Sequence, residues 1–446
     1  MSGGPEMSDV AYVSKGFIEP SPPPSTAAGP VAWLRENLFA GPVNTILTLV
    51  SLALLALLIP GIVQWAFVDA TWVASSLSEC REIGEGACWA VINERLPQFT
   101  YGFYPAELRW RPNLAFLLLL VAVAYALFDG LPGRRWGLMF AGAYPVIAYF
   151  LIWGGPFWPI VSFAVFAAGI WWGGGAVRQA VARALDTDGE DQRVGFAVLG
   201  AGALFTLLWW LAVHPATFGG LSESMPGFGL ESVESRDLGG FLLAIIIGVA
   251  GIVLSLPIGI LLALGRRSGL IFIQTLSIVF IEFVRGVPLI TLLFVANSVL
   301  AYFFPPGSNL DLILRVVIMV TMFASAYMAE VIRGGLAALP PGQYEAADSL
   351  GLDYWKSMRL IILPQALKIS IPNIVSTFIG LFKDTTLVVV IGLLDPIGLI
   401  TTIRADSAWN GLVWEFYIFV GAVFFVACYA MSRYAAYLER KLKTDR

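Results

Sequence analysis

The sequence has few charged residues, one histidine and three cysteines. Only 13% of its 446 residues are Asp, Glu, Lys or Arg, whereas a soluble globular domain carries about 25%. The hydrophobic share is 58% and the mean hydropathy is +0.78. Because no soluble core needs so much apolar surface, this composition predicts a polytopic membrane protein.

Each scarcity argues against a class of protein. Three cysteines are too few for a secreted disulfide scaffold, and the single histidine, His214, leaves too few ligands for a zinc site. A net charge of −4 without a basic stripe argues against nucleic-acid binding. The sequence lacks the G-x-x-x-x-G-K-[ST] motif of P-loop ATPases and any nucleophile–base constellation. We therefore expect no metal, no cofactor and no enzymatic activity in this chain.

The two ends of the chain differ from its middle. Residues 1–30 are rich in Pro, Ser, Gly and Ala and cannot bury enough apolar surface to fold. Residues 31–39 suit a short interfacial helix, so 1–41 are expected to be a disordered or interfacial cytoplasmic N-terminus. The first apolar run begins near residue 42, too late for a signal peptide. Residues 436–446 are expected to be a basic cytoplasmic tail.

Long apolar runs recur through the rest of the chain. A helix that spans a bilayer needs about 20 apolar residues. The runs predict an all-α fold with about ten transmembrane helices, at 43–66, 113–129, 136–153, 157–174, 194–214, 239–265, 272–303, 312–334, 370–394 and 411–432. The run 272–303 is too long for one straight helix, and Pro288 is expected to kink or break it.

Lysine and arginine in short loops predict the orientation, because such loops stay in the cytoplasm. Arg134 and Arg135 share one short loop, Arg266 and Arg267 share another, and the stretch 335–369 and the C-terminus are also basic. An even number of spans places all of these, and the N-terminus, on the cytoplasmic side. The outer side then receives 67–112, 215–238, 304–311 and 395–410.

The outer segment 67–112 contains two of the cysteines, Cys80 and Cys88. An oxidising periplasm favours a disulfide between them, and the alternative is two free thiols.

The distribution of charge divides the membrane part in two. Residues 42–214 form an accessory section of about five Trp-rich spans that contain few polar residues. Residues 239–435 form five spans with charged side chains within or beside them. Because charge inside a membrane is costly, it tends to mark function, and we expect the functional site in the C-terminal half.

A long segment, 337–366, separates two spans of that half on the cytoplasmic side. Gln343 to Leu350 read as a short amphipathic helix that follows Pro341. Gly351 suits a left-handed turn, and 353–363 read as a second helix that ends at Pro364. Two short helices at an angle would form a knob that fits a groove on a partner.

This segment closely resembles the Glu-Ala-Ala loop of ABC importer permeases. The match, with the family's spacing, consists of Glu345, Ala346, Ala347, Gly351, Leu363 and Pro364. The resemblance implies that the segment docks on a cytoplasmic ATP-binding subunit and transmits its closure.

Three further motifs resemble the polar amino acid permeases within that group. They are Phe283-Val-Arg285-Gly286-Val-Pro288-Leu289, Ala329-Glu330-Val-Ile-Arg333-Gly334 and Lys383-Asp384-Thr385-Thr386-Leu387. Together the motifs identify 239–435 as a five-span type I ABC permease core. A core preceded by an accessory section resembles the long general L-amino-acid permeases of Gram-negative bacteria.

The resemblance implies a set of partners and a location. They are two copies of an ATP-binding subunit, a second homologous permease, a periplasmic amino-acid-binding protein, an L-amino acid substrate, and the lipid of the bacterial inner membrane. ATP would be bound by a partner and not by this chain.

Polar residues of the span 370–394 are the candidate substrate ligands. Lys383 and Asp384 fall near its expected middle, where alternating access requires a substrate site. Asp384 can accept a hydrogen bond from the ammonium group of an amino acid substrate. Thr385 or Thr386 can donate a hydrogen bond to the carboxylate of that substrate. Thr377 lies two helical turns before Asp384, where related permeases for basic substrates often have glutamate, which argues against a strict preference for basic amino acids. The alternative is that Lys383 and Asp384 pair with other spans to hold the core together.

Two i,i+3 pairs, Glu282 with Arg285 and Glu330 with Arg333, are expected to form local ion pairs with a structural or coupling role.

A second hypothesis for the whole chain is an ion-coupled secondary amino acid transporter. That class predicts internal repeats with carboxylates in both halves. The two halves of this sequence are unlike each other, which favours the ATP-driven importer.

Overall fold

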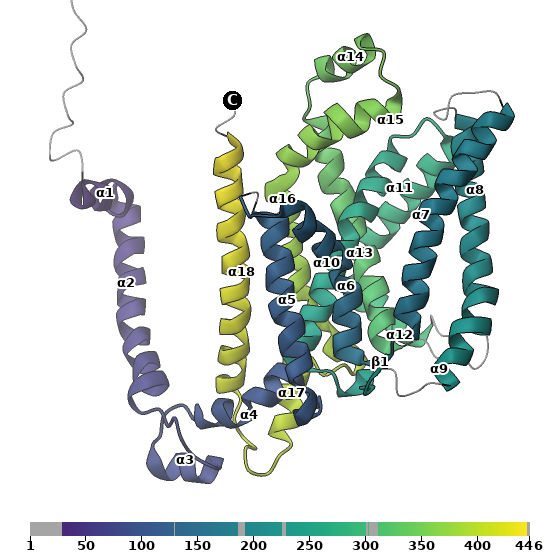
Figure 1. Ribbon diagram of the computed structural model, residues 1–446. Helices are drawn as coiled ribbons and strands as arrows, with labels where there is room; N and C mark the ends of the chain where they lie inside the picture. The colour runs from purple at the N-terminus through teal and green to yellow at the C-terminus, as the bar shows by residue number, and fades with distance from the viewer. Residues whose placement is uncertain are drawn as a thin grey trace, which may run out of the picture. The chain divides into compact units, whose positions relative to one another are not determined.

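The computed structural model describes residues 29–128, 130–185, 192–224, 229–299, 302 and 311–443, which are mostly helical (Figure 1). Residues 1–28, which the sequence predicts to be disordered, lie outside the described part. The chain divides into two compact units. One consists of Met1–Val73 and Glu79–Trp89, and the other of Ala74–Ser78 and Ala90–Arg446.

The first unit contains one long apolar helix. The short helix α1 (Pro30–Asn37) precedes α2 (Pro42–Val63), which continues into a π-helical turn, η1 (Gln64–Val68). No residue of α2 is buried within the protein. A helix that is apolar on all sides and unburied is suited to contact with lipid.

A disulfide organises the end of this unit. Cys80 and Cys88, which the sequence pairs in an oxidising compartment, are bonded, with their Cα atoms 5.9 Å apart. Cys80 belongs to α3 (Leu77–Ile83). The indole Nε1 of Trp89 donates to the carbonyl of Ala66 at 2.7 Å, which ties the residue after Cys88 to η1.

Within the described residues, nine helices are long and apolar enough to cross a membrane, and one bent pair would make a tenth. The prediction of about ten transmembrane helices is therefore confirmed. The helices and strands of the second unit are α4 (Ala90–Tyr101), η2 (Ala106–Leu108), α5 (Trp110–Leu127), α6 (Arg134–Trp153), β1 (Gly155–Pro156), α7 (Trp158–Leu185), α8 (Gln192–Leu208), η3 (Trp209–Gly219), α9 (Gly220–Ser224), β2 (Gly229–Leu230), η4 (Ser235–Asp237), α10 (Gly240–Arg266), α11 (Ile271–Gly286), α12 (Leu289–Ser298), α13 (Leu312–Ala337), α14 (Pro341–Ser349), α15 (Tyr354–Ser357), η6 (Met358–Ile362), α16 (Leu363–Asp384), η7 (Thr385–Ile391), α17 (Pro396–Arg404) and α18 (Trp414–Lys443).

Two helical hairpins precede α10 in this unit. Helix α5 packs on α6, and α7 packs on α8. The strands β1 and β2 pair antiparallel, with Gly155 opposite Leu230. The Arg111 side chain of α5 is buried and its Nη1 donates to the carbonyl of Glu231 at 2.6 Å, so this outer arginine holds the chain just after β2.

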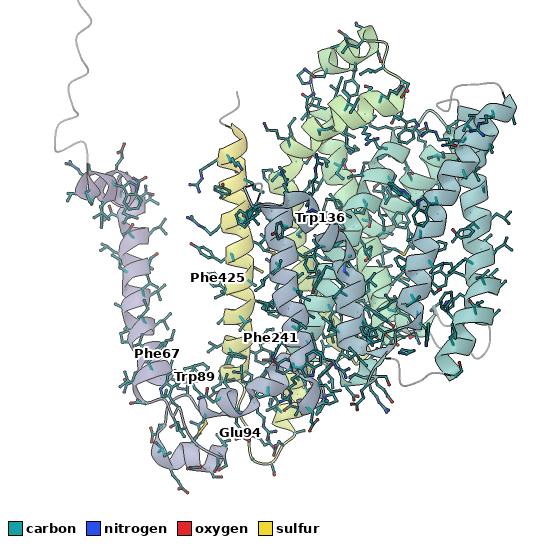
Figure 2. All side chains as sticks on the ribbon, in the orientation of Figure 1. Phe67, Trp89, Glu94, Trp136, Phe241 and Phe425 are labelled. Atoms are coloured by element: carbon teal, nitrogen blue, oxygen red, sulfur yellow. A yellow bond between two sulfur atoms is a disulfide. The ribbon has the colours of Figure 1, made fainter. Side chains whose placement is uncertain are left out.

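The C-terminal half is built around α10 and α13, which pack along each other, with α16 against α13 and α18 against α16 (Figure 1). Small residues allow these close approaches, as is common between helices in membranes. A Cβ added to Gly335 of α13 would lie 2.5 Å from the carbonyl oxygen of Ala366 on α16. Phe241 of α10 meets Phe419 and Phe424 of α18, while Phe425 and Trp136 are exposed on the outer surface (Figure 2).

The long run 272–303 is broken as predicted. Helices α11 and α12 meet at an angle of 103°. The break falls at Val287 and Pro288, and Pro288 is the residue that precedes α12. Proline has no backbone N–H and cannot continue the hydrogen-bond ladder of α11, which explains the position of the break.

The two ends of the core carry different structures. Helix α14 stands at one end, and α4 and α17 lie at the other (Figure 1). We call these the α14 end and the α17 end.

At the α17 end, the buried Asp395 caps α17 by accepting from the N–H of Gly398 at 2.9 Å and that of Ile397 at 3.1 Å. Burial raises the pKa of Asp395 to about 6, although these backbone donors act to lower it.

Candidate functional site

The segment that joins α13 to α16 forms the predicted helix–turn–helix. Helix α14 begins at Pro341, and Gly351 has a φ of +67°, the left-handed conformation expected for the turn. Asp353 then caps α15 by accepting from the N–H of Lys356 at 2.8 Å. The φ value explains why glycine is suited to this turn, since a side chain there would be strained.

Within α14, the three residues of the Glu-Ala-Ala motif face different ways. Ala347 is fully buried, whereas Glu345 and Ala346 are exposed. Leu350, at the end of the helix, is 72% exposed, and Trp355 of α15 is 66% exposed. The segment therefore anchors one face through Ala347 and presents an acidic and apolar face outward.

The prediction that the second helix ends at Pro364 is wrong. Residues 354–384 are continuously helical through α15, η6 and α16, and Pro364 stands in the first turn of α16. Leu363 is partly buried there and Pro364 is exposed. The π-helical turn η6 lies immediately before this proline. A π turn widens the helix locally, which leaves room for the proline ring where an α-helix would have a clash.

Five charged residues gather near the α14 end of the core. The prediction that Glu330 and Arg333 form an i,i+3 ion pair is confirmed. The predicted local pair of Glu282 and Arg285 is wrong, because each pairs with a different helix. Arg266 Nη1 lies 2.8 Å from Glu282 Oε1, and Arg285 Nη1 lies 3.7 Å from Glu330 Oε2.

The fifth residue, Arg266, joins the two carboxylates. Its Nη1 is also 3.5 Å from Glu330 Oε2, so α10, α11 and α13 are linked through Arg266 and Glu330. Sequence reasoning assigned Arg266 only to a basic loop. Spacing along one helix reveals i,i+3 neighbours, but it carries no information on which helix packs beside it.

The predicted substrate ligands lie at a helix boundary. Lys383 and Asp384 are the last two residues of α16, and the 3₁₀ helix η7 follows. The predicted span 370–394 is therefore not one regular α-helix around these two residues. The ladder changes from α to 3₁₀ at this point. Neither side chain forms an ion pair with another described residue, so the part of the chain that the structure describes does not support the alternative that they hold the core together.

The three candidate threonines all donate to their own helix. Thr385 is fully buried and its hydroxyl donates to the Phe382 carbonyl at 2.7 Å. Thr386 donates to the Lys383 carbonyl at 2.9 Å, and Thr377 donates to the Asn373 carbonyl at 2.9 Å. In this conformation their oxygens can accept a hydrogen bond, but their protons are already used.

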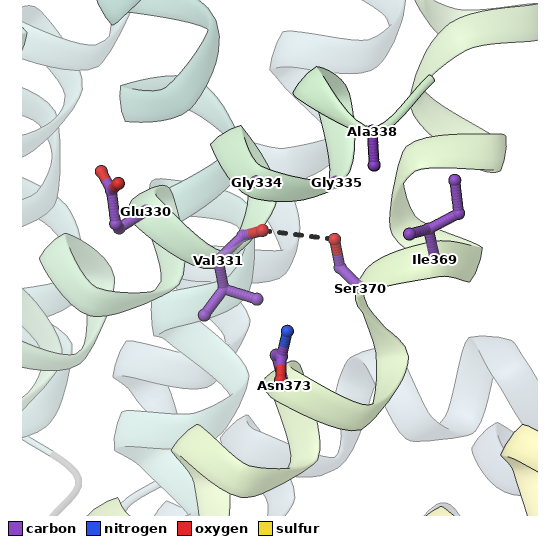
Figure 3. Close-up of a pocket in the computed structure, with 8 residues that line it drawn as sticks. All are labelled: Glu330, Val331, Gly334, Gly335, Ala338, Ile369, Ser370 and Asn373. Atoms are coloured by element: carbon purple, nitrogen blue, oxygen red, sulfur yellow. Dashed lines mark hydrogen bonds between the residues drawn. The ribbon is translucent and has the colours of Figure 1, made fainter. Parts of the chain in front are cut away.

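A cavity of about 390 Å³ lies between α13 and α16. Figure 3 shows its lining, with the hydroxyl of Ser370 donating to the Val331 carbonyl at 3.3 Å. The lining residues are Glu330, Val331, Gly334, Gly335, Ala338, Ile369, Ser370 and Asn373. The volume falls within the range of about 300–1,000 Å³ that is usual for small-molecule sites.

Asn373 connects this cavity to the predicted ligands. At about 100° per residue, positions 373, 377 and 384 fall within an arc of about 40° on α16. They span about 16 Å along the helix. Asn373, Thr377 and Asp384 therefore form one polar stripe, which begins at the cavity and ends where α16 ends. Asn373 was not among the ligands predicted from the sequence, although its i,i+4 spacing from Thr377 was a usable signal.

Comparison with known proteins defines the class. Residues 255–444 match the family described as "Binding-protein-dependent transport system inner membrane component". The chain is 51% identical over 98% of its length to the whole of the "Glutamate/glutamine/aspartate/asparagine transport system permease protein BztC" of Rhodobacter capsulatus. It is 40% identical over 96% of its length to 97% of the "Inner membrane amino-acid ABC transporter permease protein YhdY" of Escherichia coli.

The chain therefore belongs to the family of amino-acid ABC transporter permeases, and it is a multi-pass permease subunit of an ABC importer. Among solved structures, one titled "Crystal structure of an amino acid ABC transporter with histidines" is 30% identical over 45% of this chain and 91% of that chain, with a TM-score of 0.41.

Proposed function

We propose that this chain is the membrane-spanning subunit that moves polar L-amino acids inward by alternating access, driven by ATP hydrolysis on a separate subunit. The observation that carries the proposal is the α14–Gly351–α15 projection, which exposes Glu345, Ala346 and Trp355 at the end of the core nearest the ion cluster. Since the sequence has no P-loop motif, the nucleotide must be bound by a partner.

The partners follow from this architecture. Two copies of an ATP-binding subunit would dock, one on this projection and one on the equivalent projection of a second, homologous permease. A periplasmic amino-acid-binding protein would deliver substrate to the α17 end. The α14 end would then be cytoplasmic, with both termini, and the protein would lie in the bacterial inner membrane. The disulfide of Cys80 and Cys88 is compatible with a periplasmic position for residues 67–112.

The polar stripe of α16 is the proposed substrate path. Asp384 would accept the substrate ammonium, and Lys383 is exposed and suited to a carboxylate or amide group of the substrate. Asn373 both donates and accepts hydrogen bonds. Thr377 and Asn373 carry no charge for a basic side chain. We infer substrates of the glutamate, glutamine, aspartate and asparagine type, the class that the printed name of the Rhodobacter relative gives for that protein.

Uptake into proteoliposomes tests this function. The complex purified through a tag on this chain is reconstituted with ATP inside, and the binding protein and radiolabelled L-glutamate or L-glutamine are added outside. We expect uptake that requires both ATP hydrolysis and the binding protein, and weak uptake of L-arginine under the same conditions. Uptake driven by a proton or sodium gradient without ATP would overturn the proposal and favour the secondary transporter.

A further inference from the structure

Tyr344 in α14 connects three elements through one phenol group. The Nη1 of Arg267 donates to the Tyr344 hydroxyl at 2.9 Å, and the guanidinium lies 5.5 Å from the centre of the tyrosine ring. The same hydroxyl donates to the carbonyl of Leu336 at 3.2 Å. Tyr344 therefore joins α14 to the last turn of α13 and to the residue that follows α10.

The positions of both partners make this contact physically favourable. Leu336 lies in the last turn of α13, where carbonyl groups have no partner within the helix. Arg267 is the C-cap of α10, where a positive charge interacts well with the helix dipole. A guanidinium over an aromatic ring adds a cation–π attraction. The tyrosine thus satisfies an unpaired carbonyl and holds a cation where the helix end favours one.

Arg267 is also next to the hub of the ion cluster. Its neighbour Arg266 reaches Glu282 of α11 at 2.8 Å and Glu330 of α13 at 3.5 Å. Two consecutive residues at the end of α10 therefore connect α14 on one side with α11 and α13 on the other. A displacement of α14 that shifts Arg267 must move Arg266, because the two share a peptide bond.

A second contact joins α14 to the next transmembrane helix. The side-chain amide of Gln365 in α16 donates to Gln343 Oε1 at 2.9 Å. This bond is between neutral groups and reaches only α16. The Tyr344 contact is charge-assisted and is the one that leads to α10 and the ion cluster. Charge-assisted hydrogen bonds are roughly twice as strong as neutral ones.

We propose that Tyr344 and Arg267 are positioning residues that transmit the movement of α14 to α10 and, through Arg266, to the ion cluster. The inference rests on the proposed function, because it assumes that an ATP-binding subunit moves α14. It assigns the transmission to one hydrogen-bonded cation–π pair behind the docking surface, rather than to the exposed Glu345 and Ala346.

The test compares Tyr344→Phe with a matched control outside the docking segment, Tyr429→Phe in α18. Both changes remove one hydroxyl. The Tyr429 ring stacks on Phe425, and its hydroxyl has no hydrogen-bond partner among the described residues. Each variant is purified as the full complex, and ATP hydrolysis and uptake of radiolabelled L-glutamine are measured in the same proteoliposomes. The quantity of interest is the amount of L-glutamine moved per ATP hydrolysed.

We expect Tyr344→Phe to retain the ATP-binding subunit and its hydrolysis rate, but to move about tenfold less L-glutamine per ATP, the loss expected for one charge-assisted hydrogen bond. Tyr429→Phe should behave as the unaltered complex. Arg267→Ala should have a similar effect, and Arg267→Lys a smaller one, since lysine keeps the charge but not the planar group. If the two residues act through one contact, Tyr344→Phe combined with Arg267→Ala should be no worse than Arg267→Ala alone.

The possible results separate the inference from the proposed function. An unaltered complex without ATP-driven uptake would overturn the proposed function, and the inference with it. An active unaltered complex with an unchanged ratio of uptake to hydrolysis in Tyr344→Phe would overturn the inference alone. Loss of the ATP-binding subunit from the purified Tyr344→Phe complex would also overturn it, because Tyr344 would then serve docking and not transmission.

Discussion

The α14 end and the α17 end of the core are held together by different interactions. At the α14 end, three arginines and two glutamates on α10, α11 and α13 share a partly exposed cluster. At the α17 end, the fully buried Phe99 of α4 packs on Phe416 and Phe419 of α18, with ring centres 5.9 and 5.4 Å apart.

Backbone hydrogen bonds reinforce the α17 end. The N–H of Gly240 donates to the Leu394 carbonyl at 2.7 Å, and that of Phe103 donates to the Asp237 carbonyl at 3.0 Å. Arg95 of α4 forms an ion pair with Asp406, just after α17. These contacts join α10 to the segment before α17, the residues after α4 to η4, and α4 itself to the segment after α17.

This difference indicates which end suits movement. Ion pairs among several partners can exchange with little net cost when they are partly exposed, since each is worth about 0–1 kcal/mol. Buried aromatic packing has no such substitute, because an opened gap loses its contacts outright. We therefore expect the accessory residues to brace the α17 end and the conformational change to begin at the α14 end.

Removing aromatic packing at the α17 end should have the largest effect on stability. Phe99→Ala deletes a fully buried ring and should lower the free energy of unfolding by about 3–5 kcal/mol. The midpoint of thermal unfolding in detergent measures this change. Phe425→Ala is the control, because that ring is 67% exposed and should shift the midpoint little.

The same variant sharpens the comparison between the ends. At a temperature where Phe99→Ala remains folded, it should move as much substrate per ATP as the unaltered protein. A lower ratio in the folded protein would mean that the α17 end takes part in the movement, and the division between a braced end and a moving end would fail.

Neutralising Asp384, the charged residue of the polar stripe, should have the next largest effect, this time on substrate affinity. Asp384→Asn removes the charge-assisted hydrogen bond that we propose between Asp384 and the substrate ammonium, and such a bond is worth about 1.5–3 kcal/mol. At about 1.4 kcal/mol per decade, substrate affinity should fall about 10- to 150-fold. Uptake at a series of L-glutamate and L-glutamine concentrations measures it. ATP hydrolysis without substrate should persist, since the docking site that we propose for the ATP-binding subunit is α14, away from Asp384.

Asp311→Asn makes the same chemical change at a control site. Asp311 caps α13 by accepting from the Leu314 N–H at 3.2 Å, and asparagine caps a helix equally well. Equal affinities for both variants and the unaltered protein would place Asp384 outside the substrate path.

Changing the turn after α14 should have the smallest of these effects. Gly351 has φ +67° with open space around its Cα, so Gly351→Ala costs about 1–2 kcal/mol through backbone strain alone. Uptake and retention of the ATP-binding subunit should fall by about 5- to 30-fold at 1.4 kcal/mol per decade. Gly342→Ala adds the same methyl group in open space without a positive φ and should be neutral. Equal uptake and equal retention of the ATP-binding subunit in the two variants would mean that the turn at Gly351 does not contribute to docking.

Local patterns predicted the parts of the fold that depend on neighbours in sequence. Proline at 288 marked the break between α11 and α12, and glycine at 351 marked the left-handed turn. Pro364 was wrongly predicted to end a helix by the same kind of reasoning. The π-helical turn η6 accommodates the proline ring, and the helix continues into α16. A single-sequence rule for proline does not anticipate that adjustment, which depends on how the helix packs as a whole.

The sequence by itself determined the membrane class, the number of spans and the segment at α14, because each follows from composition or from the order of neighbouring residues. Only the tertiary structure decided the partners of the charges. Glu282 prefers Arg266 to its helical neighbour Arg285, and Tyr344 meets Arg267, which is 77 residues away in sequence. The physical reason is that helix periodicity fixes which side chains share a face, whereas the close packing of α10 and α13 fixes which faces meet.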